Sequence, residues 1–240
     1  MKSKVVVLFS GGIDSTVCLA QAVKIYGNKN VIAVSFDYGQ NNSKELICSK
    51  EICEYYKVEH VIIDIKNIFE FSDSSLIKKS NKDIPHESYD TQYKKLKENE
   101  NVSTNVPFRN GVMLSICASF ALSKNAKVIY YGIHHEEGIA HELYPDCSSE
   151  FDYAMDMAIY TGTGKKVSIV SPLVDMSKKE IVKLGEKLKV PFYLTWTCYE
   201  DKTYACGKCT ACVDRIKAFN ENNLNDPIKY EGWVIIWKNV

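Results

Sequence analysis

Residues 4–16, KVVVLFSGGIDST, decide how the rest of the chain is interpreted. Lys4 to Phe9 form a short and almost continuous apolar run, which is typical of a strand buried on both faces of a parallel sheet. Gly11 and Gly12 let the backbone turn sharply without a clashing Cβ, and a helical pattern begins directly after them. A strand, a glycine turn and a helix in this order indicate the first unit of an α/β domain.

The alternation of strands and helices continues along most of the chain. Apolar runs predict strands over residues 4–9, 31–36, 58–65, 127–132 and 167–171. Amphipathic patterns predict a helix from the glycine turn to about residue 26, and further helices over 42–56, 109–123, 149–160, 177–188 and a short stretch through 216. Asn42 with Glu45, and Ser177 with Glu180, have the spacing of a capping box. We therefore predict an α/β fold with a doubly wound, parallel, five-stranded sheet.

Two parts of the chain lie outside this alternation. Residues 66–102 are rich in Lys, Ser, Asn and Glu and have weak periodicity, so we interpret them as a partly ordered excursion or lid. Residues 191–240 contain clustered cysteines and end in an aromatic stretch, Trp233 to Trp237, which suggests an edge strand or a subunit contact. We predict a main domain over 1–190 and a C-terminal metal-binding segment over 191–240 that packs on it.

Composition excludes several classes of protein. Lys and Arg number 30, and Asp and Glu also number 30, so the formal charge is zero and no bulk basic field indicates direct binding of nucleic acid. The longest purely apolar runs, such as Val5 to Phe9, are far shorter than the ~20 residues of a membrane-spanning helix. The N-terminus has no charged and then apolar signal segment. We expect a soluble protein of the cytoplasm.

The nine cysteines fall into groups. Four lie singly within helical apolar patterns and are interpreted as small buried side chains: Cys18, Cys48, Cys53 and Cys117. Four others have metal-ligand spacing near the C-terminus: Cys198, Cys206, Cys209 and Cys212. Four thiolates are enough for a closed tetrahedral zinc site of the structural type. An iron–sulfur cluster is the alternative, and we favour zinc because nothing else in the sequence indicates electron transfer.

The glycine turn is a candidate phosphate-binding loop. Ser10 to Thr16 place successive amide N–H groups at the positive end of a helix, and the hydroxyl groups of this segment can add donors. A tight turn capped by Asp14 or Ser15 is the alternative. Open parallel sheets bind ligands beyond the carboxyl ends of their strands, where the strand order reverses. We therefore expect the site at the loops after Phe9, Phe36 and Gly132.

The segment SGGIDST resembles the pyrophosphate loop of the adenine-nucleotide alpha-hydrolase-like family, and it lacks the lysine of the GxxxxGK[ST] loop. Further motifs follow in order: FDYGQ at 36–40, TNVPFRN at 104–110 and YPDC at 144–147. With the cysteine cluster, this order resembles one branch of the family, the 7-cyano-7-deazaguanine synthases, from Val5 to about Phe219. The resemblance implies an ATP-dependent ligase of queuosine biosynthesis. Such an enzyme converts 7-carboxy-7-deazaguanine and ammonia to the nitrile through an adenylated intermediate.

The resemblance also implies residues for each part of the site. Within a nucleotide-binding domain over 1–190, the residues that bind ATP with Mg²⁺ are Leu8, Phe9, Ser10, Gly11, Gly12, Ile13, Asp14, Ser15, Thr16, Val17, Cys18, Phe36, Tyr38 and Gln40. Arg109 and Asp14 are implied as catalytic residues, and Asn110, Tyr144 and Asp146 as residues that bind the substrate. The cysteine cluster is implied to hold one structural Zn²⁺. The family further implies a homodimer that acts on small molecules.

Physical chemistry suggests a task for each polar residue. Negative charge develops on phosphate during adenylation, and the Arg109 guanidinium is suited to stabilise it, although a surface salt bridge is the alternative. Asp14 could steady the loop or help to hold Mg²⁺. Asp146 could accept two hydrogen bonds from the N–H and NH₂ edge of a guanine-like base, or end a turn after Pro145. We interpret Cys147 as part of the pocket wall.

Several alternatives stay open at the level of sequence. A related adenylating enzyme could stop at the amide or attach the deazaguanine to a macromolecule, and a zinc-containing binding module is the non-enzymatic alternative. The source of ammonia is not indicated. His134, His135 and His141 crowd one loop together with glutamates, which fits a second metal site or, more commonly, a solvated loop.

Overall fold

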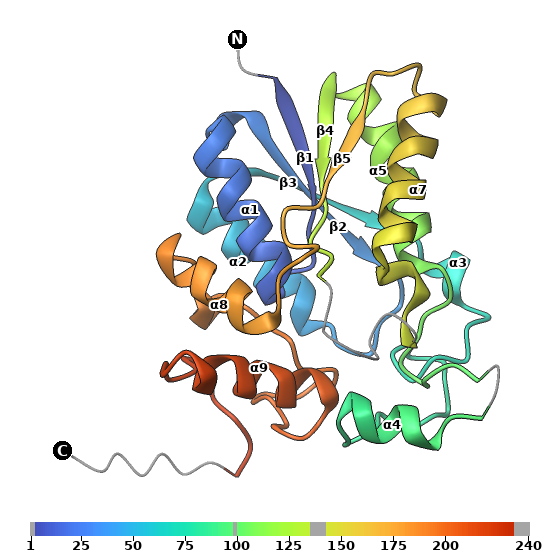
Figure 1. The fold of residues 1–240 in the computed structure, drawn as a ribbon, viewed down its shortest axis with the longest axis vertical. Helices are drawn as coiled ribbons and strands as arrows, with labels where there is room; N and C mark the ends of the chain where they lie inside the picture. The colour runs from blue at the N-terminus through green and yellow to red at the C-terminus, as the bar shows by residue number, and fades with distance from the viewer. Residues whose placement is uncertain (1–2, 98–99, 135–142, 233–240) are drawn as a thin grey trace.

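The computed structural model describes residues 3–97, 100–134 and 143–232. Its centre is a parallel sheet of five strands, which confirms the predicted fold class (Figure 1). The strands are β1 (Lys4–Leu8), β2 (Val31–Asp37), β3 (Glu59–Asp64), β4 (Ala126–Tyr130) and β5 (Ser168–Val170). They lie in the order β3-β2-β1-β4-β5, and all neighbouring pairs are parallel. The strand order therefore reverses between β1 and β4.

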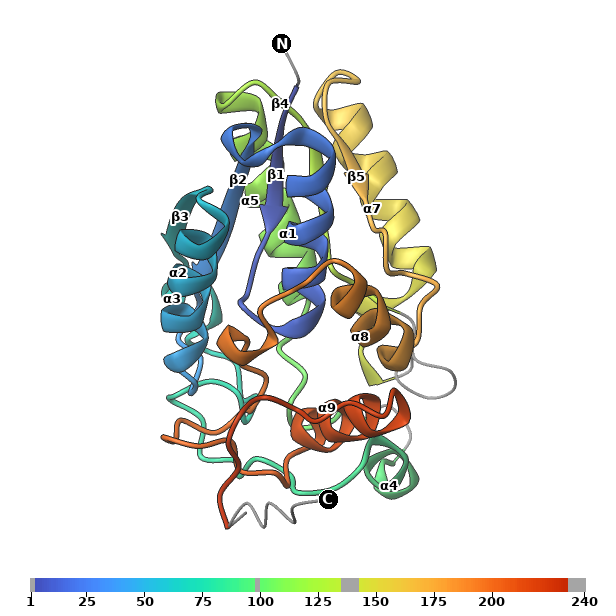
Figure 2. The ribbon, with the colours of Figure 1, turned by 90° about the vertical axis from the view of Figure 1, so that its left-hand side faces the viewer.

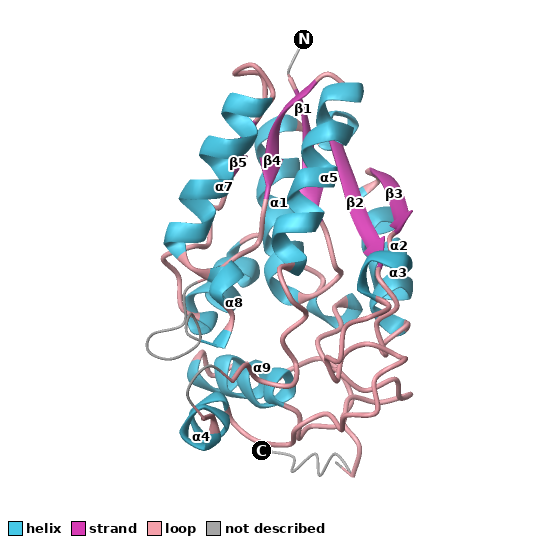
Figure 3. Cartoon of the chain, turned by 90° about the vertical axis from the view of Figure 1, so that its right-hand side faces the viewer, coloured by secondary structure: helices cyan, strands magenta, loops and turns pink. Residues whose placement is uncertain are grey.

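Helices cover both faces of the sheet, as Figures 2 and 3 show. On one face lie α1 (Ile13–Tyr26), α2 (Lys44–Tyr56) and α8 (Lys178–Lys187), and on the other lie α5 (Arg109–Ser123) and α7 (Ser149–Gly162). Residues of β1 alternate between the two cores, because successive side chains of a strand point to opposite faces. Val5 and Val7 pack in the core of α1, whereas Val6 packs in the core of α5. This double burial explains the continuous apolar run in the sequence.

The two predicted capping boxes have different outcomes. At α8, Ser177 Oγ accepts a hydrogen bond from the Glu180 N–H, and Glu180 Oε2 accepts one from the Ser177 N–H, so that prediction is confirmed. The prediction for Asn42 and Glu45 was wrong, because α2 begins one residue later, with Ser43 at the N-cap and no side-chain cap. Asn42 instead donates to the Cys198 carbonyl at 2.6 Å and ties the start of α2 to the C-terminal segment.

The excursion over 66–102 packs partly on the main core. It contains α3 (Lys66–Phe69) and α4 (Tyr89–Lys95), and Ile77 pairs with Gln40 as an isolated bridge. Leu76 and Ile77 are buried in the same core as α5, despite the polar composition of the excursion. In Figure 1, α4 lies beside α9 (Thr210–Glu221), so the excursion crosses the molecule to reach the C-terminal segment.

The C-terminal segment is anchored by a buried arginine. Arg215 of α9 is fully buried and forms hydrogen bonds with both carboxylate oxygens of Asp226, at 2.7 and 2.9 Å. Its guanidinium also donates to the carbonyl oxygens of Phe192 and Thr195. Phe192 begins a short 3-10 helix, η3 (Phe192–Leu194), and Thr195 is its C-cap residue. Two other short 3-10 helices are η1 (Asn28–Asn30) and η2 (Pro145–Cys147). The aromatic stretch Trp233–Trp237 lies outside the described residues.

Among the described residues, no helix is both long enough and apolar enough to cross a membrane.

Candidate active site

A cavity of about 320 Å³ opens beyond the carboxyl ends of β1 and β4, where the strand order reverses. We refer to it as the active-site cavity. It is lined by most of the residues that the sequence predicted: Leu8, Phe9, Ser10, Gly12, Ile13, Asp14, Ser15, Phe36, Tyr38, Gln40, Arg109, Asn110 and Tyr144. Segments far apart in the chain therefore meet in one cavity, as expected of an open parallel sheet.

The phosphate loop is held by close contact between backbones. Gly11 has φ +85°, and a Cβ at this position would lie only 2.9 Å from the Ser49 nitrogen of α2. The loop hydroxyls are bonded internally, since Ser15 Oγ accepts from the Ser10 N–H and Ser10 Oγ accepts from the Gly12 N–H. The first turn of α1 borders the cavity, and the first amides of any helix have no partner within it. The loop has the geometry to accept an anion.

Four residues of the predicted nucleotide site lie behind the loop and do not line the cavity. Val17 and Cys18 are fully buried in the core between α1 and the sheet, where burial raises the pKa of the Cys18 thiol well above its usual value. Thr16 is also buried, and its hydroxyl donates to the Gly12 carbonyl at 2.6 Å. The side chains of Thr16, Val17 and Cys18, and the backbone of Gly11, support the loop from the protein interior.

Asp14 is bound to a lysine that the sequence analysis missed. Lys178 Nζ, in the first turn of α8, lies 2.8 and 2.7 Å from the two carboxylate oxygens, and His134 Nε2 lies 3.7 Å away. Burial alone would raise the pKa of Asp14, but the charges of Lys178 and His134 outweigh it and lower the pKa. Of the two roles considered for Asp14, this geometry favours steadying the loop. The capping box at Ser177 was the available signal that Lys178 starts a helix.

Arg109 is the first residue of α5 and faces the segment that follows β2. Its Nη1 donates to the Tyr38 hydroxyl at 3.0 Å, and the guanidinium lies 5.3 Å from the centre of the Tyr38 ring. Burial would lower the pKa of Arg109, but the nearby Tyr38, Asp146 and Glu45 raise it, so the guanidinium stays charged. Glu45 is a second residue that the sequence analysis missed, because its spacing was assigned to a helix cap. Burial raises the pKa of the Glu45 carboxyl to about 7, against the lowering effect of Arg109.

The YPDC motif lies differently from its predicted role. Tyr144 and Cys147 line the cavity, but Asp146 is buried and does not. Asp146 Oδ2 accepts the Asn110 N–H at 2.9 Å, and the Asp146 carbonyl accepts Asn110 Nδ2 at 3.0 Å. Asp146 therefore bonds to the first turn of α5, next to Arg109, and does not itself line the cavity.

Aromatic side chains from the excursion and the C-terminal segment complete the wall. Tyr89 of α4 and Tyr199 both line the cavity, and their hydroxyls lie 3.4 Å apart. The Tyr89 ring also packs edge-on against Tyr144, with 5.8 Å between ring centres. Because aromatic walls suit planar ligands, this end of the cavity can hold a flat heterocycle. His134 lines the cavity beside Asp14, whereas His135 and His141 lie outside the described residues.

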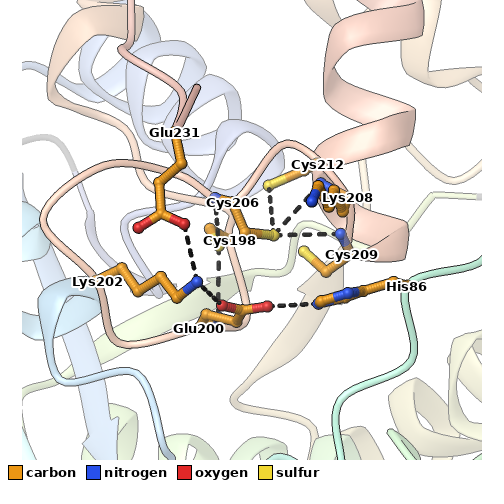
Figure 4. Close-up of polar contacts among 9 residues, drawn as sticks. All are labelled: His86, Cys198, Glu200, Lys202, Cys206, Lys208, Cys209, Cys212 and Glu231. Carbon is orange, nitrogen blue, oxygen red and sulfur yellow. Dashed lines mark hydrogen bonds and ion pairs between the residues drawn. The ribbon is translucent and has the colours of Figure 1, made fainter. Parts of the chain in front are cut away.

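The four clustered cysteines point toward one another in the C-terminal segment (Figure 4). Cys198, Cys206, Cys209 and Cys212 are buried, and their Sγ atoms all lie within 4.8 Å of one another. Backbone N–H groups point at the sulfurs: Cys206 N lies 3.3 Å from Cys198 Sγ, and Cys209 N lies 3.2 Å from Cys206 Sγ. Such hydrogen bonds stabilise thiolates, which are the form that binds metal. Zn–S bonds of ~2.3 Å in a tetrahedron place sulfurs about 3.8 Å apart. Cys206 Sγ and Cys212 Sγ lie 3.9 Å apart, so the cluster fits a metal ion.

A glycine loop, a helix N-terminus and a partly buried arginine in one cavity define a class, the α/β proteins that bind phosphate-bearing ligands at the carboxyl edge of a parallel sheet. The chain belongs, within that class, to the family described as queuosine biosynthesis protein QueC, whose model matches residues 4–223. It is thereby placed among the ATP-dependent enzymes of queuosine biosynthesis.

Relatives of known name cover nearly the whole chain. A 7-cyano-7-deazaguanine synthase from Pseudoalteromonas atlantica is 42% identical over 231 residues, which are 96% of this chain and 100% of the relative. The 7-cyano-7-deazaguanine synthase 1 of Colwellia psychrerythraea is 40% identical over the same shares. A synthase of the same name from Caldicellulosiruptor saccharolyticus is 40% identical over 95% of this chain and 96% of the relative.

Proposed function

We propose that this protein converts 7-carboxy-7-deazaguanine, ammonia and ATP into 7-cyano-7-deazaguanine. The observation that carries the proposal is the 42% identity to a synthase of that name along 96% of this chain. The cavity supports it, because an anion loop, an arginine and an aromatic wall are what a nucleotide and a flat carboxylic acid require.

The reaction needs two activations. A carboxylate is a poor electrophile, and transfer of AMP from ATP to its oxygen creates a mixed anhydride with a stable phosphate leaving group. Ammonia attacks the anhydride carbon, AMP leaves, and an amide results. A second ATP adenylates the amide oxygen, releasing pyrophosphate and one N–H proton. The resulting imidate loses AMP and the second N–H proton to form the nitrile.

The described residues can divide this work between them. Ser10 to Ser15 would hold the departing pyrophosphate at the N-terminus of α1, and Arg109 would stabilise charge on the transferred phosphate. Lys178 and Asp14 would keep the loop in place, since both Asp14 oxygens are within hydrogen-bond distance of Lys178 Nζ. Mg²⁺ would come with the phosphates of ATP and neutralise part of their charge.

We further propose that the cysteine cluster holds one structural Zn²⁺, which four protein ligands leave without an open position for water. The protein would act in the cytoplasm as a homodimer, on small molecules and without direct contact to nucleic acid, as its balanced charge suggests.

One time course tests the proposed function. The protein is incubated with 7-carboxy-7-deazaguanine, ammonium and excess ATP, and the products are followed by mass spectrometry. We expect AMP and pyrophosphate, a transient amide and then the nitrile, at two ATP per nitrile. Amide that accumulates without conversion would assign the chain to an amide-forming relative, and ADP with orthophosphate would contradict adenylation.

A further inference from the structure

A second, smaller chamber adjoins the active-site cavity. Its volume is about 110 Å³, far below the roughly 300 Å³ at which pockets begin to hold drug-sized ligands. It shares six lining residues with the cavity: Tyr38, Gln40, Glu45, Arg109, Tyr144 and Tyr199. We refer to it as the side chamber. It is too small for the nucleotide or the base, but its shared wall would give a small molecule access to a carboxylic acid bound in the cavity.

Most polar groups of the side chamber already have partners. Gln40 accepts from the Tyr38 N–H and donates to the Phe36 carbonyl, and Asn42 donates to the Cys198 carbonyl. Thr104 Oγ1 lies 2.5 Å from the Tyr144 hydroxyl. Among the described residues that line this chamber, Glu45 carries the one carboxylate and Arg109 the one cation. The ligand chemistry is therefore set by these two groups and by the tyrosine rings.

Glu45 is held at the junction of the two spaces by the phosphate loop. A Cβ on Gly11 would lie 3.0 Å from the Glu45 carbonyl oxygen, so the backbones of the loop and of α2 touch at this residue. Movement of Glu45 away from the loop would open this contact. The backbone of Glu45 is thus fixed against the loop that would hold the phosphates of a bound nucleotide.

A carboxylate beside aromatic faces is a site for a small cation. Tyr144 and Tyr199 line the chamber with Glu45, as does Tyr38, whose ring already lies beside the Arg109 guanidinium, and aromatic rings attract ammonium ions. The third substrate of the proposed reaction is ammonia, which exists mainly as ammonium at neutral pH and must lose a proton before it can attack.

We propose that the side chamber binds ammonium and that Glu45 accepts its proton, an inference that rests on the proposed function. The N–H bond breaks, its electron pair stays on nitrogen, and the proton forms an O–H bond on Glu45. The lone pair of the released ammonia then attacks the carbonyl carbon of the mixed anhydride. The carbon–nitrogen bond forms as the bond to phosphate oxygen breaks, and AMP leaves. The nitrogen then loses its surplus proton to water.

The surroundings of Glu45 fit a proton acceptor that works near neutral pH. Burial raises the pKa of its carboxyl to about 7. The titratable groups around the Glu45 carboxyl are Arg109 from α5, Tyr38 after β2, Tyr144, Tyr199 and, on the same helix as Glu45, Cys48. Lys44 does not face this carboxyl, because its Nζ donates to the Thr203 carbonyl. Arg109 repels ammonium until its charge is matched by the phosphate of the adenylate. Ammonium therefore binds after adenylation.

The test separates adenylation from amide formation. Wild type, Glu45→Gln and the control Glu51→Gln, an exposed residue of the same helix, are compared. Pyrophosphate release with the carboxylic acid and no ammonium measures adenylation. Amide formation is then measured against ammonium and against hydroxylamine, which is uncharged at neutral pH and needs no proton acceptor.

We expect Glu45→Gln to keep adenylation within about twofold and to lose about 10²-fold in kcat/KM for ammonium at pH 7. Hydroxylamine should be used almost as well as by wild type. The defect should shrink as the pH rises, since the solution then supplies uncharged ammonia. Glu51→Gln should match wild type. If Glu45→Gln does not fold, Glu45→Asp, which withdraws the carboxylate by one methylene, should show a smaller loss of the same kind.

Two results would overturn the inference alone. The first is an equal loss of adenylation and amide formation in the Glu45 variants. The second is a raised KM for 7-carboxy-7-deazaguanine with an unchanged kcat/KM for ammonium, which would make Glu45 a residue that binds the deazaguanine base. Absence of pyrophosphate release by wild type would instead overturn the proposed function, and the inference with it.

Discussion

Asp14 is fixed by a contact between the first turn of α1 and the first turn of α8. Both of its carboxylate oxygens accept from Lys178 Nζ, and its side chain is about one quarter exposed. Breaking such a pair leaves one charge partly buried without its partner, which costs more than the net contribution of the intact pair. The pair therefore links the position of the phosphate loop to the packing of α8.

Replacement of Lys178 by Met should lower the free energy of unfolding by about 1–3 kcal/mol at pH 7. The pKa of Asp14 is lowered in the folded protein, so its contribution is present above the unfolded value of 3.8 and is lost as the pH falls through the folded value. The cost of Lys178→Met should therefore decrease in acid, as measured by urea unfolding. Lys179→Met, at an exposed neighbour, is the matched control. Additive effects of Lys178→Met and Asp14→Asn in the double variant would contradict the coupling.

At the scale of elements, the excursion and the C-terminal segment depend on each other. Gln92 of α4 is buried and donates to Thr210 Oγ1 at the start of α9, at 2.8 Å. Thr210 Oγ1 in turn donates to the Glu87 carbonyl, at 2.9 Å. Near this contact, His86 lies against Glu200, between two of the clustered cysteines in the chain (Figure 4). The cysteine cluster thus holds both its own segment and the tyrosine wall that α4 supplies.

Gln92→Leu should weaken the docking of α4 without emptying the cysteine cluster. Because Tyr89 precedes it on α4 and lines the cavity, we expect a several-fold rise in KM for the deazaguanine substrate and a smaller change in kcat. Lys94→Gln, on the exposed face of the same helix, is the control. Steady-state kinetics with saturating ATP measures both constants, and an unchanged KM would show that α4 does not form part of the substrate wall.

Cys206→Ser should release the bound metal and lower the thermal midpoint of unfolding. The physical reason is that a structural metal site contributes its binding free energy to folding. Elemental analysis should find one zinc per chain in wild type and in the control Cys48→Ser, whose cysteine lies outside the cluster. Iron in the wild-type protein would contradict the zinc proposal and assign the four cysteines to an iron–sulfur cluster.

Across the whole molecule, the site depends on how closely two elements approach at the reversal of strand order. A Cβ on Gly132, just after β4, would lie 3.1 Å from the Ser15 nitrogen at the start of α1. Backbone atoms cannot give way as a flexible side chain can, so the loop and the strand are in direct contact here. This contact joins the two halves of the sheet at the active-site cavity.

Gly132→Ala should therefore displace the phosphate loop. We expect a loss of about 1–3 kcal/mol of stability and a weaker affinity for ATP, since overpacking a close contact forces the backbone to shift. Gly162→Ala, where an added Cβ meets nothing within 4 Å, should leave both unchanged. Urea unfolding and ATP titration calorimetry measure the two effects, and normal ATP affinity in Gly132→Ala would contradict this role.

Local pattern was sufficient for most elements and for the phosphate loop. The strand alternation, the start of α5 at Arg109 and the cap of α8 at Ser177 follow from periodicity and spacing between neighbours in the chain. The capping box at Asn42 did not form, because α2 begins after Ser43. Asn42 Oδ1 accepts from the Lys44 N–H, and its Nδ2 donates to the Cys198 carbonyl, 156 positions away. For Asp146 the sequence left a ligand role and a turn open, because its bond to the Asn110 N–H also joins distant segments.

The amino-acid sequence by itself determined the fold class, the anion loop and the cysteine cluster, because each depends on residues close together in the chain or on a simple alternation. Only the tertiary structure decided how the carboxylates near the cavity are placed. Asp14 lines the cavity but is paired with Lys178, Asp146 is buried against the start of α5, and Glu45 lines both the cavity and the side chamber. Whether a polar side chain binds a ligand depends on which partners it already has, and those partners come from the packing of distant elements.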